Sequence, residues 1–266
     1  MSSNSFGFTR KQGPGKSSNV IDYDGASYGG AGGEYGSGGP VGSTYGSIIN
    51  PINPGSGGRG QESNGGGALI VVTSGTATVN GTISANGGGG VTSSWPGAGA
   101  GGTVNISTTS LTGSGTISAN GGDCYSNYGG GGGGRVAISL SSGTDFSDIS
   151  FQTYGGDGTS NTEGAPGTIY LEDSSDGTGQ GELIIDNNSV DANPAKTLIN
   201  NANHSAGVTV GSIRVRNNGI FKVGTGTTLT LIGSGTTVEV DSSSILNNSG
   251  TLVVSGTGGY LAGSFV

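Results

Sequence analysis

GTISANGG occupies residues Gly81–Gly88 and returns letter for letter at Gly115–Gly122. An exact match over a whole octapeptide, followed by further strand and glycine patterns at a similar spacing, indicates an internal repeat. Repeats of this length are typical of solenoids and other stacked arrays. Each copy carries one large apolar residue, Ile83 or Ile117, so a single unit buries too little apolar surface to fold alone. The octapeptide therefore predicts a structure made by stacking.

Four units can be aligned around the octapeptide, each with a strand, a turn, a second strand and a glycine-rich loop. The strands are short, rich in β-branched residues and bounded by Gly, Asn and Ser. The first strands are expected at Ala68–Thr73, Thr103–Ser107, Arg135–Leu140 and Thr168–Glu172. The second strands are expected at Thr76–Asn86, Thr116–Asn120, Ile149–Thr153 and Glu182–Asp186.

Beyond Ala206 the glycine-rich loops stop and strand candidates follow at short, regular intervals. Three such strands would make one turn of a parallel β-helix. Asn217-Asn218 and Asn247-Asn248 fall at expected turns, where asparagine accepts the left-handed conformation and can form ladders between turns. The candidates are Ile213–Val215, Ile220–Val223, Thr228–Ile232, Thr237–Val240, Ser244–Leu246 and Thr251–Val254.

The two patterns predict two domains, a glycine-rich repeat β-solenoid module at residues 1–190 and a β-helical tail at residues 206–266. Between them, Asp191–Ser205 is the one candidate for a short helix. The predicted fold class is all-β, a parallel β-solenoid (β-helix) with stacked glycine-rich loops.

Glycine supplies 61 of the 266 residues, and long glycine tracts normally behave as flexible loops because ordering them costs so much backbone entropy. Polyglycine II is the ordered alternative, an extended threefold helix that packs in bundles. Because these tracts recur at the period of the repeat, stacking would bring them side by side. We therefore expect polyglycine II helices, with flexible loops as the alternative.

The charge excludes several classes of partner. The net charge of −8 and the pI near 4.4 argue against nucleic acid, because no basic stripe is present. No apolar run is long enough to cross a bilayer, so membrane insertion is not expected. No signal peptide is recognisable either, and the abrupt start of the repeat suggests a piece of a longer chain. Cys124 is the only cysteine, which excludes an intramolecular disulfide.

No catalytic motif stands out, and we predict that the chain is not an enzyme. Acidic residues fall mainly at expected turns, where capping or solvation accounts for most of them. His204 lies in a loop pattern. Arg135 begins a core-like strand, where it could pair with a neighbouring carboxylate or meet an acidic sugar, and structural pairing is favoured. No cofactor is predicted, although oxygen-rich clusters that calcium could accept occur without matching the EF-hand loop. These calcium candidates are Asp22, Asp24, Glu172, Asp173 and Asp176.

Aromatic residues interleaved with glycine are the candidate ligand contacts. They could stack against sugar rings or simply cover the flank of a glycine tract. The residues concerned are Tyr28, Tyr35, Tyr45, Trp95 and Tyr125.

The chain resembles a known kind of module through GGGGGGRVAI (Gly129–Ile138), the repeated GTISANGG, GAPGTIYL (Gly164–Leu171) and GELIIDNN (Gly181–Asn188). These motifs are similar to the glycine-rich repeat modules of very large bacterial and environmental surface proteins. The tail is similar to the β-helical stalks of haemagglutinin-like adhesins. A looser similarity links the tracts to phage tail-tip adhesins, although the strands here are longer. The resemblance implies an extracellular or cell-surface location and a structural or adhesive role, and it transfers no catalytic residue.

The predicted function is that of an extracellular structural protein, a filament, stalk or adhesin segment that associates end to end. Three alternatives remain open. The chain could be a carbohydrate-binding or polysaccharide-cleaving β-helix protein, or a phage receptor-binding adhesin, with a glycan or cell-surface receptor as partner. Ice binding is a further alternative, because Thr76-Ala77-Thr78 and Thr228-Leu229-Thr230 resemble threonine ladders, although not at a constant period.

Overall fold

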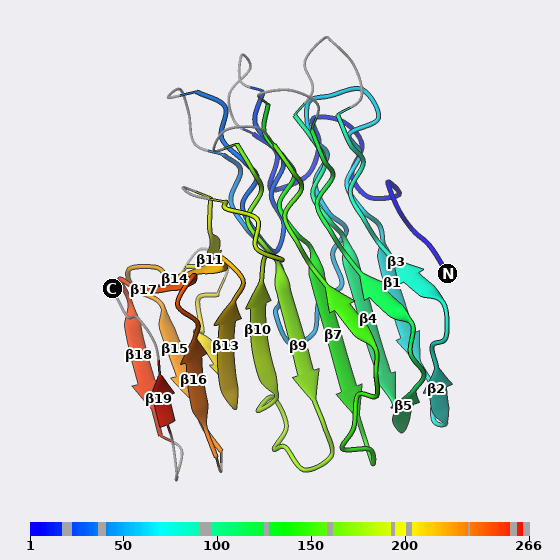
Figure 1. Cartoon of the computed structure of the whole chain (residues 1–266), viewed down its shortest axis with the longest axis vertical. Coiled ribbons are helices and arrows are strands. Elements are labelled where there is room, and N and C mark those ends of the chain that lie inside the picture. Colours follow the sequence, from blue (N-terminus) through cyan, green and yellow to red (C-terminus); the bar gives the residue numbers. More distant parts are fainter. Residues whose placement is uncertain are drawn as a thin grey trace.

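A computed structural model describes residues 1–17, 23–36, 41–90, 97–124, 128–158, 162–192, 195–200, 204–233, 235–255 and 260–262. These residues form strands, turns and extended segments without any helix, so the predicted all-β class is confirmed. Most neighbouring strands are parallel and lie in stacked sheets, an arrangement compatible with the predicted β-solenoid. Figure 1 shows the strands in one half of the molecule and the glycine-rich segments extending from their ends.

The glycine-rich half contributes to three sheets. In the largest, β1 (Ala68–Val72), β4 (Thr103–Thr108), β7 (Arg135–Leu140) and β9 (Thr168–Glu172) lie side by side in parallel. The second comprises β3 (Thr82–Ser84), β6 (Thr116–Ser118) and β8 (Ser150–Gln152), and the third comprises β2 (Thr76–Thr78) and β5 (Ser110–Thr112). Ile83 lies opposite Ile117. The two copies of the octapeptide therefore lie side by side in adjacent units, with equivalent residues paired.

From β10 onward the chain places its strands in the large sheet and in two further sheets, and we call this part, which includes the predicted tail at residues 206–266, the tail. The large sheet receives β10 (Glu182–Asp186), β13 (Ser212–Arg216), β16 (Thr237–Val240) and β19 (Tyr260–Ala262). The fourth sheet holds β11 (Thr197–Ile199), β14 (Ile220–Val223) and β17 (Ile245–Asn248), and the fifth holds β12 (Val208–Val210), β15 (Thr228–Leu231) and β18 (Thr251–Val254). Pairing of β10 with β13 and of β13 with β16 is parallel, as predicted.

The chain reverses direction between β9 and β10. These two strands pair antiparallel, with Leu171 opposite Glu182 and Ile169 opposite Ile184. Both strands of the predicted fourth unit therefore lie in the same sheet, whereas the two strands of each earlier unit lie in different sheets. The prediction of a fourth equivalent unit was wrong, because residues 173–181 form a tight reversal instead of crossing to the second sheet.

The large sheet separates two apolar cores. Side chains of one face of β4, β7 and β9, including Val104, Val136 and Ile169, pack in the first core with the residues of β6. Leu183 and Ile213 belong to the second core, which the three sheets of the tail enclose. Because successive strand residues point to opposite faces, Ile184 joins the first core and its neighbours join the second. The sheet is therefore a shared wall that is buried on both faces at β9 and β10.

The tract Gly129–Gly134 occupies the centre of the glycine-rich bundle. Its N–H groups donate to six carbonyl oxygens in three neighbouring segments, and the recipient segment repeats every third residue. Gly129 and Gly132 donate to Tyr23 and Ala26, for example. Its carbonyl groups accept bonds from three further segments and, at Gly134, from β9. A period of three is that of an extended threefold chain, and every polar backbone group of the tract is satisfied.

Side chains are excluded from this tract. A Cβ atom added at any of the six glycines would lie between 1.9 and 2.1 Å from a backbone oxygen of another segment. Atoms that are not bonded never approach so closely, so the hexaglycine sequence is a packing requirement and not a linker composition. The alternative of flexible loops is wrong for this tract, where the chain is fixed by backbone hydrogen bonds on all sides.

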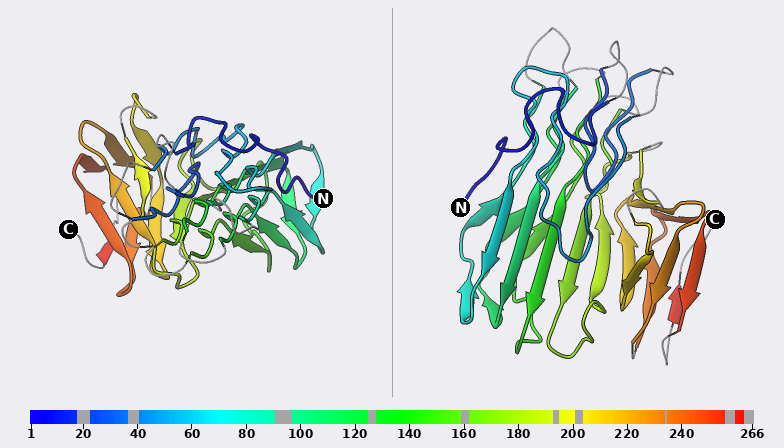
Figure 2. Two further views of the ribbon diagram at one scale, coloured as in Figure 1. Left: turned by 90° about the horizontal axis from the view of Figure 1, so that it is seen from above. Right: turned by 180° about the vertical axis from the view of Figure 1, so that it is seen from behind.

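The described residues between 1 and 58 run lengthwise across the stacked units. Met1 donates from its N-terminal ammonium group to the Thr82 carbonyl of β3 in the first unit. Further along, Ala31 donates to Lys196, and the Thr44 hydroxyl donates to Leu198 in the tail. The segment then returns toward the first units, and the right-hand view of Figure 2 shows it running over the glycine-rich segments, with one loop reaching down over the strands of the large sheet. It therefore contacts both the first unit and β11 at the beginning of the tail.

Two local predictions in the tail were wrong. The described part of Asp191–Ser205 contains β11 and no helix. Asn247 and Asn248 lie within β17 and not at a turn. Asn217 and Asn218 do occupy a turn in the left-handed conformation, with φ angles of 54° and 63°. The Asn217 side chain donates to Asp186 in the preceding turn of chain, so the predicted ladder is present here.

Candidate functional site

Two of the predicted ligand-contacting tyrosines are structural. Tyr28 is completely buried, and its hydroxyl forms a 2.7 Å hydrogen bond with Thr103 in β4. The ring of Tyr45 lies 4.6 Å from that of Tyr28, and its hydroxyl donates to the Pro54 carbonyl. Tyr28 therefore has no surface on which a sugar could stack. Both tyrosines anchor the lengthwise segment against the large sheet.

Arg135 completes this buried cluster without the carboxylate partner that the sequence suggested. Its guanidinium group donates twice to the Tyr45 carbonyl, at 2.7 and 3.1 Å, and once to the Thr168 hydroxyl at 2.9 Å. The Arg135 charge also lies over the ring of Tyr28, 5.4 Å from its centroid. Burial lowers the pKa of Arg135 and raises that of Tyr28. The cation is thus held by neutral groups alone, which marks it as a structural residue.

Tyr35 belongs to a second aromatic cluster that the sequence did not reveal. Its ring lies 5.2 Å from that of Tyr23 and 5.1 Å from that of Tyr128, and all three are half-buried. Asp24 accepts the backbone N–H of Tyr35 and the hydroxyl of Ser17. The cluster thus joins the N-terminal part of the chain to Tyr128, which lies about one hundred residues further along. Trp95 and Tyr125, also predicted as ligand contacts, lie outside the described residues.

The calcium candidates do not converge in the described part of the chain. Asp24 is buried and holds Tyr35, while Asp22 lies outside the described residues. Within residues 172–176, the Asp173 carboxylate caps the N–H and hydroxyl of Ser175, and Asp176 caps the N–H of Asp173. Glu172 accepts bonds from the Tyr170 hydroxyl and from Gly179. No group of three acidic, histidine or cysteine residues suited to a metal exists among the residues described.

A groove lined by polar side chains and glycine backbone lies on the outer face of the glycine bundle. Its volume is about 700 Å³, and it crosses three extended segments that belong to successive units. Residues separated by three positions point outward on each segment, as in Asn120 and Asp123 or Tyr154 and Asp157. The glycines between them are buried. This face could not be recognised from the sequence, because side chains at every third residue share one face only if the glycine tracts are extended threefold chains.

The side chains along the groove are positioned by a ladder between units. The Asn86 side-chain oxygen accepts the N–H of Asn120, and the Asn120 oxygen accepts the N–H of Tyr154, at 2.8 and 2.9 Å. Three residues further along the same segments, the Asp123 carboxylate accepts the N–H of Asp157 at 2.9 Å. Asn86 and Asn120 occupy the same position in the two copies of the octapeptide, so stacking of the copies places them side by side and forms the ladder. It fixes the outward side chains at the spacing of adjacent strands.

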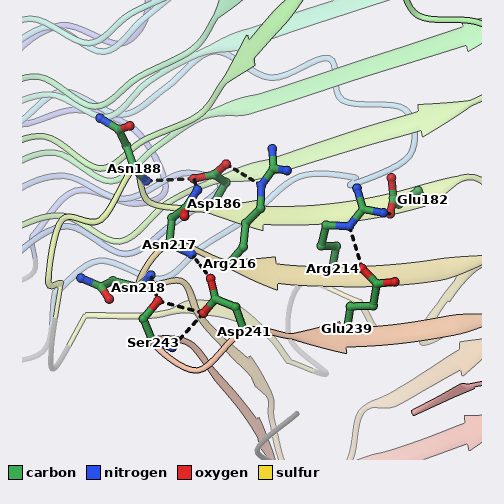
Figure 3. A network of polar contacts seen from close by, with 10 residues as sticks. All are labelled: Glu182, Asp186, Asn188, Arg214, Arg216, Asn217, Asn218, Glu239, Asp241 and Ser243. Atoms are coloured by element: carbon green, nitrogen blue, oxygen red, sulfur yellow. Dashed lines mark hydrogen bonds and ion pairs between the residues drawn. The ribbon is translucent and has the colours of Figure 1, made fainter. Parts of the chain in front are cut away.

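A charged network covers the outer face of the tail beside this groove (Figure 3). Arg214 lies between Glu182 and Glu239, 3.1 Å from each, and Arg216 pairs with Asp186 at 2.7 Å. Burial raises the pKa of Glu182, and the Arg214 charge acts against this shift. Opposite charges on facing residues of adjacent strands favour this register over one shifted by a residue.

His204 gives the fold a predictable dependence on pH. Burial and the Arg135 charge lower its pKa from 6.5 to about 4. The unfolded chain therefore binds a proton that the folded chain rejects, so this residue reduces stability as the pH falls from about 6.5 to about 4.

We expect the urea midpoint to fall between pH 7 and pH 4.5 by less in His204→Gln than in the wild type. Chemical denaturation followed by circular dichroism measures both. The comparison is needed because Asp241, whose folded pKa is lowered, also loses stability in acid. Equal losses in both proteins would contradict the assignment to His204.

The first unit leaves a strand edge open. Among the described residues, β1 has a neighbour on one side only, β4, and β2 likewise pairs only with β5. By contrast, the edge of β3 is bonded to residues 1–5, because Ser3 donates to Ser84 and Ser84 donates to Met1. Ile70 and Val72 of β1 are 53% and 78% exposed. At this end of the array, residues 1–5 therefore cover the backbone edge of β3, whereas the edge of β1 is open.

Comparisons with protein-family models, with curated proteins and with solved structures find no significant match. The described residues include no helix able to cross a membrane. The threonine pairs of the ice-binding alternative occur in two separate sheets. Thr76 and Thr78 of β2 form hydroxyl hydrogen bonds with Ser110 and Thr112, and Thr228 and Thr230 of β15 lie opposite Thr251 and Thr209.

Proposed function

We propose that the chain is a rigid, non-catalytic segment of an extracellular filament, stalk or adhesin. In this proposal it is a parallel β-solenoid whose glycine-rich loops form a bundle of polyglycine II helices. The observation that supports it most directly is the hydrogen bonding of Gly129–Gly134 to six surrounding segments and β9. A chain without side chains, fixed on all sides, contributes rigidity and offers no group for chemistry. The extracellular location rests on the resemblance of the motifs to surface-protein modules.

Association with further copies would occur through the open end at β1. The segment Ala68–Thr73 is uncharged, rich in β-branched residues and free of proline, the composition that favours strand pairing. Thr73 donates its N–H to Ser107 of β4, so the N–H groups of Ile70 and Val72 point to the open side. At the other end, β17 and β18 each have one neighbour among the described residues. A contact between unlike ends generates fibres.

We expect the double variant Ile70→Lys and Val72→Lys to prevent self-association, because charges on an edge strand oppose pairing. Sedimentation velocity over a concentration series, with electron microscopy of the same samples, measures this. The wild type should grow in mean mass with concentration and the variant should remain monomeric. Both side chains are exposed, so the unfolding midpoint should stay close to that of the wild type.

Ser141→Lys with Ser142→Lys is the matched control, because it adds the same charge at exposed positions after β7. This control should associate like the wild type. A wild type that stays monomeric at every concentration, or a lysine variant that associates normally, would disprove assembly through β1.

A further inference from the structure

We propose that the groove across the asparagine ladder binds a neutral polysaccharide chain. This proposal does not depend on self-association through β1, because β1 does not line the groove. The groove is lined by Asn86, Asn120, Asp123, Tyr154 and Asp157, together with glycine backbone, Cys124 and residues 188 and 190. These side chains come from three successive units and repeat at the spacing of neighbouring strands. A repeating surface of this kind suits a repeating ligand.

The polar groups in the groove match sugar hydroxyls. A hydroxyl both donates and accepts, and an asparagine amide offers two donors and an acceptor, while a carboxylate offers acceptors. The Asn86 and Asn120 oxygens are used by the ladder, so their NH₂ groups remain as the donors, with that of Asn120 also 3.4 Å from Gln152. The Asp157 carboxylate is exposed and accepts no hydrogen bond from the described residues.

Tyr154 supplies the apolar surface that a sugar ring needs. It occupies the position that asparagine holds in the two preceding units, at the same rung of the ladder. Its ring is half-buried and lines the hollow. An aromatic ring provides a large rigid contact surface together with a polar hydroxyl. The surrounding glycines lack side chains, so the floor is flat backbone.

Charge determines which glycans fit. Among the described residues, two carboxylates line the groove, and no lysine or arginine does. The whole chain carries a net charge of −8. Like charges facing one another across an interface oppose binding, so acidic polysaccharides are disfavoured. A neutral chain has no such penalty and uses the amide and carboxylate groups as hydrogen-bond partners.

The groove is wide because one unit of the repeat lacks an outward-pointing side chain. Gly89 takes the place that Asp123 and Asp157 hold in the next two units, so one outward side chain is missing there. A Cβ at Gly89 would meet its nearest neighbour, the Asp123 carbonyl oxygen, at 3.0 Å, which is far less crowded than in the central tract. Glycine here opens the surface and is not demanded by packing alone.

Binding should be measured by titration calorimetry and saturation-transfer NMR with three hexasaccharides. They are β-1,4-linked glucose, β-1,4-linked N-acetylglucosamine and its deacetylated, cationic form. We expect at least one neutral hexamer to bind, with affinity about tenfold weaker in Tyr154→Ala and nearly retained in Tyr154→Phe. Ile52→Ala is the control, because Ile52 is an exposed apolar residue that does not line the groove and follows Pro51, whose carbonyl is bonded to Asn105 of β4.

Each other outcome counts against the proposal. Failure of both neutral hexamers to bind would overturn it, as would binding that Tyr154→Ala leaves unchanged. Binding of the cationic hexamer alone, lost in Asp157→Asn, would overturn the neutral class and assign the groove to amino sugars. Thermal unfolding of each variant separates loss of the site from loss of the fold, and Tyr154→Phe with Asp157→Asn keeps the test valid if Tyr154→Ala is unstable.

Discussion

Gly131→Ala should prevent folding. The added Cβ atom would lie 2.0 Å from the Gly99 carbonyl oxygen and 2.6 Å from its carbon, in a tract whose neighbours are bonded on all sides. Relief would require separation of segments from three different units. We expect a loss of more than about 5 kcal/mol, which equals or exceeds the whole stability of many domains.

Gly81→Ala is the matched control for this effect. No atom lies within 4 Å of a Cβ added at Gly81, apart from its own chain neighbours, although this glycine opens the repeated octapeptide. The variant should be neutral or slightly more stable, by up to about 1 kcal/mol, because alanine restricts the unfolded chain. Circular dichroism and urea denaturation measure both variants. A folded Gly131→Ala of near wild-type stability would contradict the packing of the central tract.

Arg135→Ala should cause the second largest loss, about 4 kcal/mol. The substitution leaves a cavity in the wall between sheet and bundle, removes the cation over the Tyr28 ring, and leaves the buried Tyr45 carbonyl without its donors. Release of the buried charge offsets only part of this, because three good hydrogen bonds already compensate it. Urea denaturation gives the free energy of unfolding.

Two further variants test the cause. Arg135→Lys should recover little stability, because an ammonium group lacks the planar fork that reaches both Tyr45 and Thr168. Arg214→Ala removes an arginine whose side chain is 37% exposed in the charged network, and it should cost less than about 1 kcal/mol. If Arg135→Ala were as mild as Arg214→Ala, Arg135 would not be the anchor described above.

Much of the repeat could be predicted from the octapeptide. Ile83 and Ile117 face one another in register, and several strands, including Ile220–Val223 and Thr237–Val240, begin and end at the predicted residues. Local alternation of apolar and polar residues is sufficient there. Three-residue strands such as β5 and β12 were missed, because so short a stretch carries almost no periodicity.

The reversal and the sites could not be predicted in the same way. Residues 173–181 contain the same Asp, Ser and Gly as other turns, and only the tertiary pairing of β9 with β10 distinguishes them. Burial of Tyr28 and partial exposure of Tyr35 depend on which segment lies beside each. Glycine tracts carry no apolar pattern, so the sequence around a tyrosine does not indicate which way it points. Tyr154 was missed for that reason.

The lengthwise course of the described residues between 1 and 58 changes how the array should unfold. In an ordinary solenoid each unit contacts only its neighbours, so units can be lost one after another from an end. Here a single segment is bonded to Thr82 at one end and to Leu198 in the tail, which couples units that never touch. The contact with Leu198 joins residues 154 positions apart, and it can form only after the units between the first unit and β11 are stacked. The segment therefore ties the glycine-rich units to the beginning of the tail, so its contacts form late in folding and these units unfold together instead of one after another.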